Sequence, residues 1–194
     1  IVVSSLTNGT AATAKVWAIN AFGTSAPSDA SASFTPALQI AIFNGYDSNR
    51  DLVEQINFST QGNSTSFGGD LSQNKYGNAW WGSATRGVSA GGYVTSPTNA
   101  ATDKVEYFTF NSAGNATDFG NLSAVRQYAG ALANSTRGIV GGGAGSPFGA
   151  INIIDYFTTA STGNATDFGD LTLSRYYTSG VSSPTRGLFM GGDD

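Results

Sequence analysis

The sequence predicts an all-β protein built from three copies of one unit of about fifty residues. Strings that begin Thr-Arg-Gly and end Gly-Gly recur at Thr85–Gly92, Thr136–Gly143 and Thr185–Gly192. The chain of 194 residues has 26 glycines, 12% aromatic residues and only 11% charged residues. Glycine suits tight turns and aromatic side chains favour strands, so this composition is typical of turn-rich β structure.

Two further markers keep a constant position relative to these strings. One is an aliphatic residue followed by an acid, and the other is Gly-Asn followed by a phenylalanine. The first marker stands at Val53-Glu54, Val105-Glu106 and Ile154-Asp155, and the phenylalanines of the second are Phe67, Phe119 and Phe168. Because they recur and aromatic residues dominate core energetics, these phenylalanines are predicted to be buried between repeats.

Each repeat offers four short strands, separated by Gly, Asn, Ser and Pro. In the third repeat the predicted strands are Ile153–Thr159, Ala165–Leu171, Tyr176–Ser182 and Gly187–Gly191. Four strands in about fifty residues is the size of one β-propeller blade, so blades are predicted at approximately 46–92, 93–143 and 144–192. Propellers have about four to eight blades. We therefore expect a larger ring, completed by a continuation of the chain or by the assembly of several chains, of which we favour the continuation.

The order of these markers resembles the Kelch repeat over residues 38–194. In that family a Gly-Gly pair closes an apolar strand, and a loop, a Val-Glu-x-Tyr strand, an aromatic residue and an arginine follow. The counterparts here are Gly91-Gly92, Val105-Glu106-Tyr107, Phe119 and Arg126, and then Gly142-Gly143, Ile154-Asp155-Tyr156, Phe168 and Arg175. The aromatic position holds phenylalanine where Kelch repeats usually have tryptophan. The resemblance implies Kelch-like propeller blades.

A different pattern occupies residues 1–36. An alternating strand at Ala14–Asn20 and the turn-forming stretch Gly23–Ser28 resemble the last strands of a fibronectin type III domain. The resemblance implies a partial fibronectin type III-like β-sandwich segment. Pro36 is the expected linker between it and the repeats at 37–194.

The strings Gly163–Leu171 and Ser183–Gly192 also resemble repeats of virion proteins from tailed bacteriophages, especially marine ones. Such proteins often carry Kelch-like arrays behind immunoglobulin-like or fibronectin type III modules. The resemblance implies a virion or extracellular location, other virion proteins as partners, and a homo-oligomer.

The residue inventory excludes several kinds of chemistry. The chain has neither histidine nor cysteine, so Ser–His–Asp, Cys–His and histidine-based zinc catalysis are impossible. A net charge of −4, with nine basic residues spread along the chain, argues against nucleic-acid binding. No apolar stretch approaches the roughly 20 residues that span a bilayer, so no membrane insertion is expected. Asp118, Asp167 and Asp170 lack the ligand spacing of a calcium site, and no cofactor is predicted.

Carboxylate chemistry, as in glycoside hydrolysis, is what remains. However, Glu54, Glu106 and Asp155 occupy the same position in every repeat, and an active site is made once. These acids are therefore predicted to be structural, and the protein is predicted not to be an enzyme. Two sets of bases recur in the same way, Arg86, Arg137 and Arg186, and Lys75, Arg126 and Arg175. The expected partners of these bases are the recurring acids and exposed carbonyl groups. Recurrent ion pairs of this kind would fix the register between blades.

Positions that depart from the repeat are the candidates for binding. Trp80-Trp81 stands where Leu132-Ala133 is expected, and one of the two rings should lie in the core because neighbours on a strand face opposite sides. Tyr128, Tyr176 and Tyr177 are further candidates for exposed aromatic residues. The variable loops Tyr46–Leu52, Tyr93–Lys104 and Ala144–Ile153 follow equivalent strands, so a propeller would present them on one face. The candidate binding residues are Tyr46, Asp47, Trp80, Trp81, Tyr93, Thr95, Ser146 and Phe148.

These observations predict a non-enzymatic structural and adhesion component of a phage virion, in a tail fibre or capsid appendage. Its expected ligand is a glycan or protein of the host cell surface. Two alternatives stay open, a carbohydrate-active depolymerase spike and a secreted bacterial adhesin. A catalytic pair of acids unique to one blade would favour the depolymerase.

Overall fold

The prediction of an all-β protein is confirmed. A computed structural model describes residues 11–33, 40–44, 51–58 and 60–194, and these residues form eighteen strands and no helix. The chain divides into two compact units, Ile1–Gln39 and Ile40–Asp194. The predicted linker at Pro36 belongs to residues 34–39, which lie outside the described residues.

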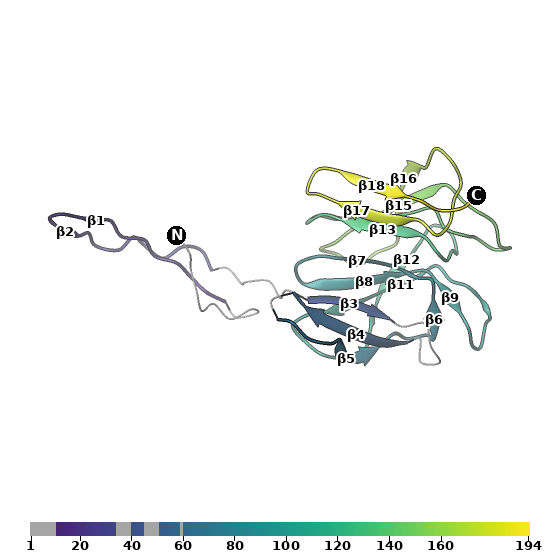
Figure 1. Ribbon diagram of the computed structural model, residues 1–194, viewed down its shortest axis with the longest axis horizontal. Coiled ribbons are helices and arrows are strands. Elements are labelled where there is room, and N and C mark those ends of the chain that lie inside the picture. Colours follow the sequence, from purple (N-terminus) through teal and green to yellow (C-terminus); the bar gives the residue numbers. More distant parts are fainter. Residues whose placement is uncertain (1–10, 34–39, 45–50, 59) are drawn as a thin grey trace. The chain divides into compact units, whose positions relative to one another are not determined.

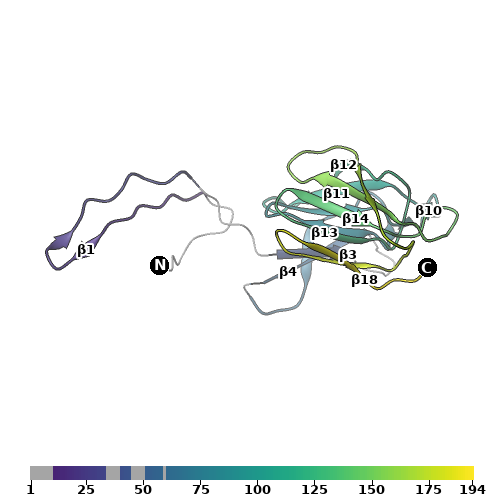
Figure 2. The ribbon, with the colours of Figure 1, turned by 90° about the horizontal axis from the view of Figure 1, so that it is seen from above.

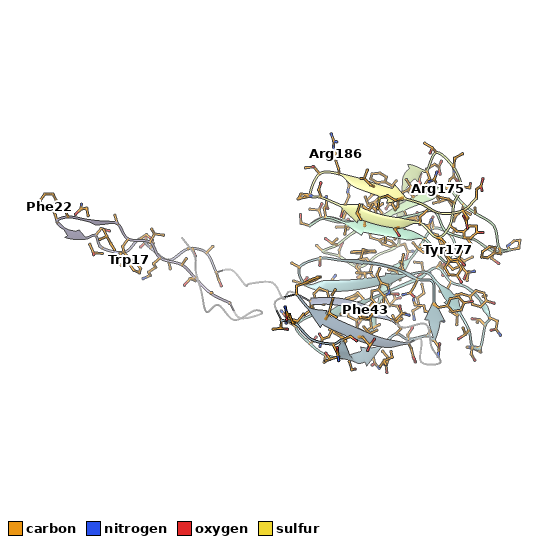
Figure 3. The ribbon with its side chains drawn as sticks, viewed as in Figure 1. Trp17, Phe22, Phe43, Arg175, Tyr177 and Arg186 are labelled. Atoms are coloured by element: carbon orange, nitrogen blue, oxygen red, sulfur yellow. The ribbon has the colours of Figure 1, made fainter. Side chains whose placement is uncertain are left out.

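The described part of the first unit is one long hairpin. Its tip pairs β1 (Ile19–Asn20) with β2 (Gly23–Thr24) in an antiparallel manner. Below the tip, three serines hold the two arms together, because each backbone N–H donates across the hairpin and each hydroxyl accepts from the opposite strand. The serines are Ser25, Ser28 and Ser31, opposite Ala18, Val16 and Ala14. Trp17 and Phe22 are exposed (Figure 3). The fibronectin type III resemblance remains a prediction.

The second unit consists of four main antiparallel sheets stacked in sequence order (Figure 1). The first sheet contains β3 (Ile40–Asn44), β4 (Leu52–Asn57) and β5 (Thr65–Asp70). The second contains β7 (Ala79–Gly82), β8 (Arg86–Ala90), β11 (Lys104–Thr109) and β12 (Thr117–Asn121). The third contains β13 (Gly130–Ala133), β14 (Arg137–Gly141), β15 (Ile153–Thr158) and β16 (Thr166–Asp170). The fourth contains β17 (Ser179–Ser182) and β18 (Gly187–Met190).

Each sheet is a meander in which successive strands are neighbours. The first strands of the second, third and fourth sheets, β7, β13 and β17, lie side by side. Figure 2 shows from above that the sheets overlie one another. The described strands close into neither a barrel nor a ring.

The grouping of strands differs from the predicted units. All four strands predicted for the third repeat are present, in slightly shorter form, as β15, β16, β17 and β18. However, β15 and β16 complete the third sheet, whereas β17 and β18 start the fourth. The Gly-Gly pair therefore stands within a sheet, after its second strand, and does not mark the border between two sheets.

The Gly-Gly pairs occupy equivalent places, as predicted. They follow β8, β14 and β18, and all six glycines have positive φ, with +63° and +108° at Gly91-Gly92. A Cβ at Gly91 would come within 2.5 Å of the Arg126 carbonyl oxygen, and one at Gly142 within 2.5 Å of the Arg175 carbonyl oxygen. Arg126 and Arg175 belong to the segments that join one main sheet to the next, residues 71–78, 122–129 and 171–178, which we call the linkers between sheets. The positive φ and the close approach of the linker both require glycine.

The asparagines of the Gly-Asn marker also connect neighbouring sheets. The side chains of Asn115 and Asn164 accept hydrogen bonds from the N–H groups of Asp70 and Asn121, at 3.2 and 3.1 Å, on the last strand of the preceding sheet. These asparagines therefore repeat because they join neighbouring sheets.

The core lies between the sheets. Phe119 packs edge-on against Trp81 and Phe157, with ring centroids 5.7 and 5.6 Å apart. Phe67 and Phe119 are buried, as predicted, but the prediction for Phe168 is wrong, because this side chain is 50% exposed. The ring that covers Phe119 is Phe157, on the third strand of the next sheet. Phe168 has no such cover, because the fourth sheet contains only two strands among the described residues.

The register corrects the alignment of the tryptophan pair. Trp81 lies opposite Val88, and Leu132 lies opposite Ile139, so Trp80-Trp81 corresponds to Ala131-Leu132. The expected counterpart, Leu132-Ala133, was displaced by one residue. One ring does lie in the core, as predicted, and it belongs to Trp81.

Candidate functional site

Six aromatic rings form a continuous row across the repeats at the ends of the strands. We call this row the aromatic ladder. It begins in the loop Tyr93–Lys104, which we call the first described loop, and ends in the loop Ala144–Ile153, the second described loop. Between them it crosses the linkers between sheets. The order of the rings is Tyr93, Tyr76, Tyr128, Tyr177, Tyr176 and Phe148. Successive ring centroids are 5.4, 6.1, 4.3, 5.0 and 5.1 Å apart. Tyr177 lies at the right-hand end of the sheets in Figure 3, and the C-terminus lies at the same end in Figure 1.

An unusual backbone conformation positions the middle of the ladder. Tyr128 and Tyr177 have positive φ angles of 57° and 55°, a region that bulky residues rarely adopt. The equivalent residue of the preceding linker is Gly77, at 65°. The N–H of Tyr128 donates to the Gly77 carbonyl oxygen at 2.6 Å, and the N–H of Tyr177 donates to the Tyr128 carbonyl oxygen at 2.9 Å. Glycine satisfies this conformation at Gly77, so at Tyr128 and Tyr177 the strained backbone carries a ring that glycine would not supply.

The hydroxyl group of Tyr128 interacts with its two neighbours in the ladder, Tyr177 and Tyr76. Burial raises the pKa of Tyr128, and the hydrogen bond to Tyr177 raises it further. Tyr128 therefore stays neutral over the physiological pH range. The ladder presents apolar ring faces together with hydroxyl groups, which act as both donors and acceptors.

The two described loops supply the ends of the ladder. In the first, β9 (Tyr93–Val94) pairs with β10 (Ala100–Ala101) and with β6 (Lys75–Tyr76). The Tyr93 hydroxyl donates to the Asn99 carbonyl oxygen at 2.8 Å, and Thr95 bonds to the Asn74 carbonyl oxygen through its N–H and its hydroxyl. These contacts hold the loop in shape.

The second loop repeats this design with bridges between Gln127 and Ala144 and between Ala144 and Ala150. Both loops contain a cis Ser-Pro bond, at Ser96-Pro97 and Ser146-Pro147. Ser146 is exposed, and Phe148, at 59% exposure, rests edge-on against Tyr176. The structure thus brings Tyr93 and Phe148 into one row, with Thr95 and Ser146 in the loops that carry them.

The remaining candidates do not join the ladder. Trp81 is a buried core residue, so its prediction as a binding residue is wrong. Trp80 is partly buried, stacks on Phe108, and donates from Nε1 to the Asn44 side-chain oxygen at 2.9 Å. Tyr46 and Asp47 lie outside the described residues. Sequence reasoning missed Tyr76 as a candidate, although an aromatic residue directly after Lys75, as after Arg175, is a visible signal.

Two of the recurring acids lie in buried ion pairs between sheets. The Lys75 ammonium is 3.2 Å from the Glu106 carboxylate, and Arg126 donates to the Asp155 carboxylate. All four side chains are at most 1% exposed. Each acid also accepts from the linker that carries its base, from the N–H of Ser72 or Ser123. The prediction that these acids and bases pair is confirmed.

Burial and charge oppose each other at the first pair. Burial raises the pKa of Glu106, but the Lys75 charge, the Ser72 hydrogen bond and the Lys104 charge outweigh it, and the pKa ends below its ordinary value. Burial lowers the pKa of Lys75, against the attraction of Glu106. Burial likewise lowers the pKa of Arg126, and Asp155 opposes this shift. The geometry at both sites is that of a charged pair.

The other set of arginines has different partners from those expected. The guanidinium of Arg86 lies over the Tyr107 ring at 4.5 Å, and that of Arg137 lies over the Tyr156 ring at 4.8 Å. These are cation–π contacts within one sheet. Arg86 also donates to the Thr159 carbonyl oxygen at 3.4 Å. The expected pairing of these two arginines with the recurring acids is therefore wrong, whereas the expected carbonyl partner is present at Arg86.

Comparison with known proteins adds no family. The chain matches no protein-family model and no curated protein. Within the described part of the chain, no group of three acidic, histidine or cysteine side chains could hold a metal ion. No helix among the described residues is long and apolar enough to cross a membrane.

Proposed function

We propose that this protein is a non-enzymatic structural and adhesion component of a bacteriophage virion, in a tail fibre or capsid appendage. In this proposal the repeated sheets are blades of a Kelch-like propeller, and the aromatic ladder binds a glycan of the host surface. The repeat pattern and the virion-like strings support the virion context by resemblance. The ladder supports the binding role.

The aromatic ladder is the observation that carries the proposal. Tyrosine offers a large, rigid and amphipathic contact surface at low entropic cost, which suits recognition. Sugar rings have apolar faces and hydroxyl edges, and the ladder has the complementary ring faces and hydroxyl groups. A row of rings across several linkers also matches an extended polysaccharide better than a small ligand enclosed in a pocket.

The burial of two recurring acids removes them as candidates for the catalytic pair of a depolymerase. Glycoside hydrolysis needs two carboxyl groups that face one cleft. Glu106 and Asp155 are instead buried against bases of the neighbouring linkers. Both acids thus have a structural role between sheets.

The natural variation of the repeat provides a clean test. Tyr128→Gly with Tyr177→Gly removes two rings and keeps the positive φ, because Gly77 already occupies the same position in the first linker. Polysaccharides from candidate host cells would be titrated against the intact chain and the double variant by calorimetry. We expect binding about tenfold or more weaker in the variant, since each aromatic contact is worth about 0.5–1.5 kcal/mol.

Phe22→Ala is the matched control, because this fully exposed ring belongs to the other unit. It should leave binding unchanged. Equal binding by the folded double variant, or shortening of the polysaccharide during the titration, would contradict the proposal. The second result would instead support a depolymerase.

A further inference from the structure

The turn that joins β4 to β5 borders a pocket in the first sheet. Its volume is about 400 Å³, and small-ligand sites usually have about 300–1,000 Å³. We call it the amide pocket, because side-chain amides and hydroxyl groups make up most of its lining. The lining residues are Ile40, Gln55, Asn57, Thr60, Gln61, Gly62, Asn63 and Thr65. Gln55 is partly buried and the other polar residues are exposed, so a ligand in solution can reach them.

Most of the amides in this pocket depart from the repeat. The constant distance from the acid to the Gly-Asn marker aligns the three sheets residue by residue. The counterparts of Gln55, Asn57 and Gln61 are Tyr107, Thr109 and Ala113 in the second sheet, and Tyr156, Thr158 and Thr162 in the third. Residues that pack the sheets together must recur. These three amides do not recur, so packing between sheets does not account for them.

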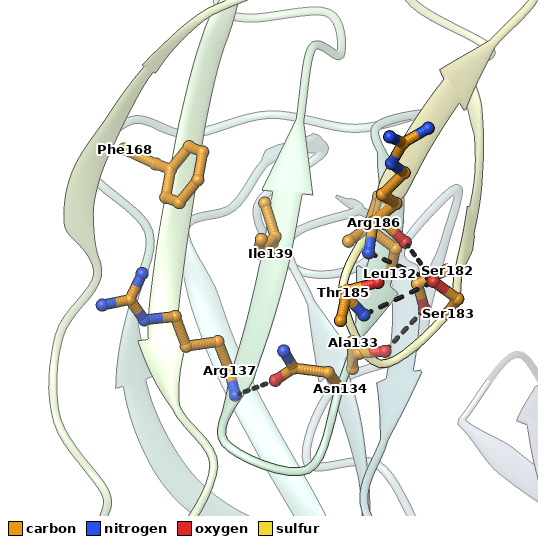
Figure 4. Close-up of a pocket in the computed structure, with 11 residues that line it drawn as sticks. Leu132, Ala133, Asn134, Arg137, Ile139, Phe168, Ser182, Ser183, Thr185 and Arg186 are labelled. Carbon is orange, nitrogen blue, oxygen red and sulfur yellow. Dashed lines mark hydrogen bonds between the residues drawn. The ribbon is translucent and has the colours of Figure 1, made fainter.

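A stacked pair of side chains occupies the equivalent place in the next two sheets. The Arg86 guanidinium lies over the Tyr107 ring at 4.5 Å, and the Arg137 guanidinium lies over the Tyr156 ring at 4.8 Å. Figure 4 shows the extended side chain of Arg137 on the face of the third sheet that also carries Phe168. A long cation and an aromatic ring thus cover this part of the face.

The first sheet lacks this stacked pair. Ile40 lies opposite Asn57 as Arg86 lies opposite Thr109, so Ile40 takes the place of the arginine. Gln55 takes the place of the tyrosine. Isoleucine is shorter than arginine and glutamine has no ring, so the two side chains leave the amide pocket uncovered.

The amide pocket lies at the opposite end of the strands from the aromatic ladder. The pairing of β3 with β4 runs from Ile40 and Asn57 at one end to Asn44 and Val53 at the other. The pocket surrounds the first end. The Gly-Gly pair that leads into the first described loop follows Ala90, which corresponds to Asn44 at the second end. The pocket and the ladder are therefore separate sites.

The lining of the pocket suits an uncharged ligand that is rich in hydroxyl groups. None of the described residues that line it carries a charge. A side-chain amide offers two N–H donors and a carbonyl acceptor, and a threonine hydroxyl both donates and accepts. Sugar hydroxyls also donate and accept, whereas a phosphate or carboxylate ligand would find no cation here to pair with. Ile40 adds an apolar wall, which suits the C–H face of a sugar ring.

We propose that the amide pocket binds a neutral monosaccharide unit. Gln55 and Gln61 would donate to its hydroxyl groups and accept from them, and Ile40 would contact its ring. This site goes beyond the extended polysaccharide proposed for the aromatic ladder and does not depend on it.

The other two sheets supply the variants that test this site. Saturation-transfer NMR on the full chain would use glucose, galactose, mannose, fucose, N-acetylglucosamine and N-acetylgalactosamine. We expect saturable binding of at least one of these sugars. Ile40→Arg with Gln55→Tyr introduces the stacked pair of the next two sheets and should abolish this binding. Gln61→Ala introduces the residue of the second sheet and should weaken binding about two- to tenfold, because it removes hydrogen bonds to the sugar.

Two control variants locate the binding. Thr162→Ala changes an exposed residue at the position of Gln61 in the third sheet, and should have no effect. Tyr128→Gly with Tyr177→Gly removes two rings of the aromatic ladder, and should also leave this binding unchanged. Circular dichroism would confirm that each variant keeps its β structure.

Three results would overturn the proposal. The first is the absence of saturation transfer from the folded chain to any of the six sugars. The second is binding that Ile40→Arg with Gln55→Tyr does not weaken. If the ladder variant removes that binding instead, the ladder is the sugar site and the proposed adhesion role stands without the amide pocket. The third is tighter binding of glucuronic acid or glucose 6-phosphate than of glucose, because the pocket has no cation to favour them.

Discussion

Arg126 donates a hydrogen bond to the carboxylate of Asp155, and both side chains are completely buried between the second and third sheets. The guanidinium also donates to the carbonyl oxygens of Gly142 and Ile153, at 3.3 and 2.9 Å. One side chain therefore joins a linker, a Gly-Gly pair and the third strand of the next sheet. Such a pair fixes how one sheet is placed on the next, whatever its net contribution to stability.

Removing one partner of this pair should be costly. Asp155→Asn leaves the buried guanidinium without a counter-charge, and we expect the free energy of unfolding to fall by about 3–5 kcal/mol. The double variant Arg126→Met with Asp155→Leu should be less destabilised than the two single changes added together. Urea denaturation followed by fluorescence would measure both. Arg175→Met is the matched control and should cost less than about 1 kcal/mol, since Arg175 is partly exposed.

The pair of Lys75 and Glu106 predicts a dependence on pH. The pKa of Glu106 is lowered in the folded state, so its contribution is present above the ordinary value of 4.5 and is lost as the pH falls through the folded value. The free energy of unfolding of the intact chain should therefore decrease on acidification below about pH 4.5. In Lys75→Met with Glu106→Gln this decrease should be smaller. Parallel curves for the two proteins between pH 7 and pH 3 would show that Glu106 does not contribute to it.

Equivalent phenylalanines should differ in their contribution to stability. Phe119→Ala removes a buried ring that contacts Trp81, Tyr107 and Phe157, and should cost about 3–5 kcal/mol. Phe168→Ala removes a ring that is 50% exposed, and should cost less than about 1.5 kcal/mol. Thermal or urea unfolding would measure both. Similar losses at the two sites would mean that Phe168 is covered in solution.

Two equivalent glycines separate backbone strain from contact between sheets. Gly120 and Gly169 have φ angles of +145° and +135°, so alanine is strained at both. A Cβ at Gly120 would overlap the Gly163 carbonyl group, whereas one at Gly169 would meet nothing within 4 Å. Gly120→Ala should therefore be destabilised by about 1–3 kcal/mol more than Gly169→Ala, because overpacking adds to the strain. Equal losses in urea denaturation would show that strain alone decides.

The sequence by itself determined the period of the repeat, the β class of its elements and the residues that recur in it. This was possible because every sheet packs on neighbours of the same shape, so the packing residues must repeat. The pairing of Lys75 with Glu106 and of Arg126 with Asp155 followed from the same reasoning, whereas Arg86 and Arg137 contact tyrosine rings in place of the acids. The last repeat was the exception, because Phe168 keeps the repeat residue without the neighbour that buries Phe119.

Only the tertiary structure decided which strands share a sheet. A period has no natural starting point, so the sequence could not show that β15 joins β14 and leaves β17 to the next sheet. The sequence named every ring except Tyr76 as a candidate, but it did not show that these rings form one row, the aromatic ladder. Its rings come from loops and linkers far apart in the chain, and the positive φ of Tyr128 and Tyr177 and the hydrogen bonds between successive linkers bring them together. Such contacts depend on how whole sheets stack, and no local pattern encodes them.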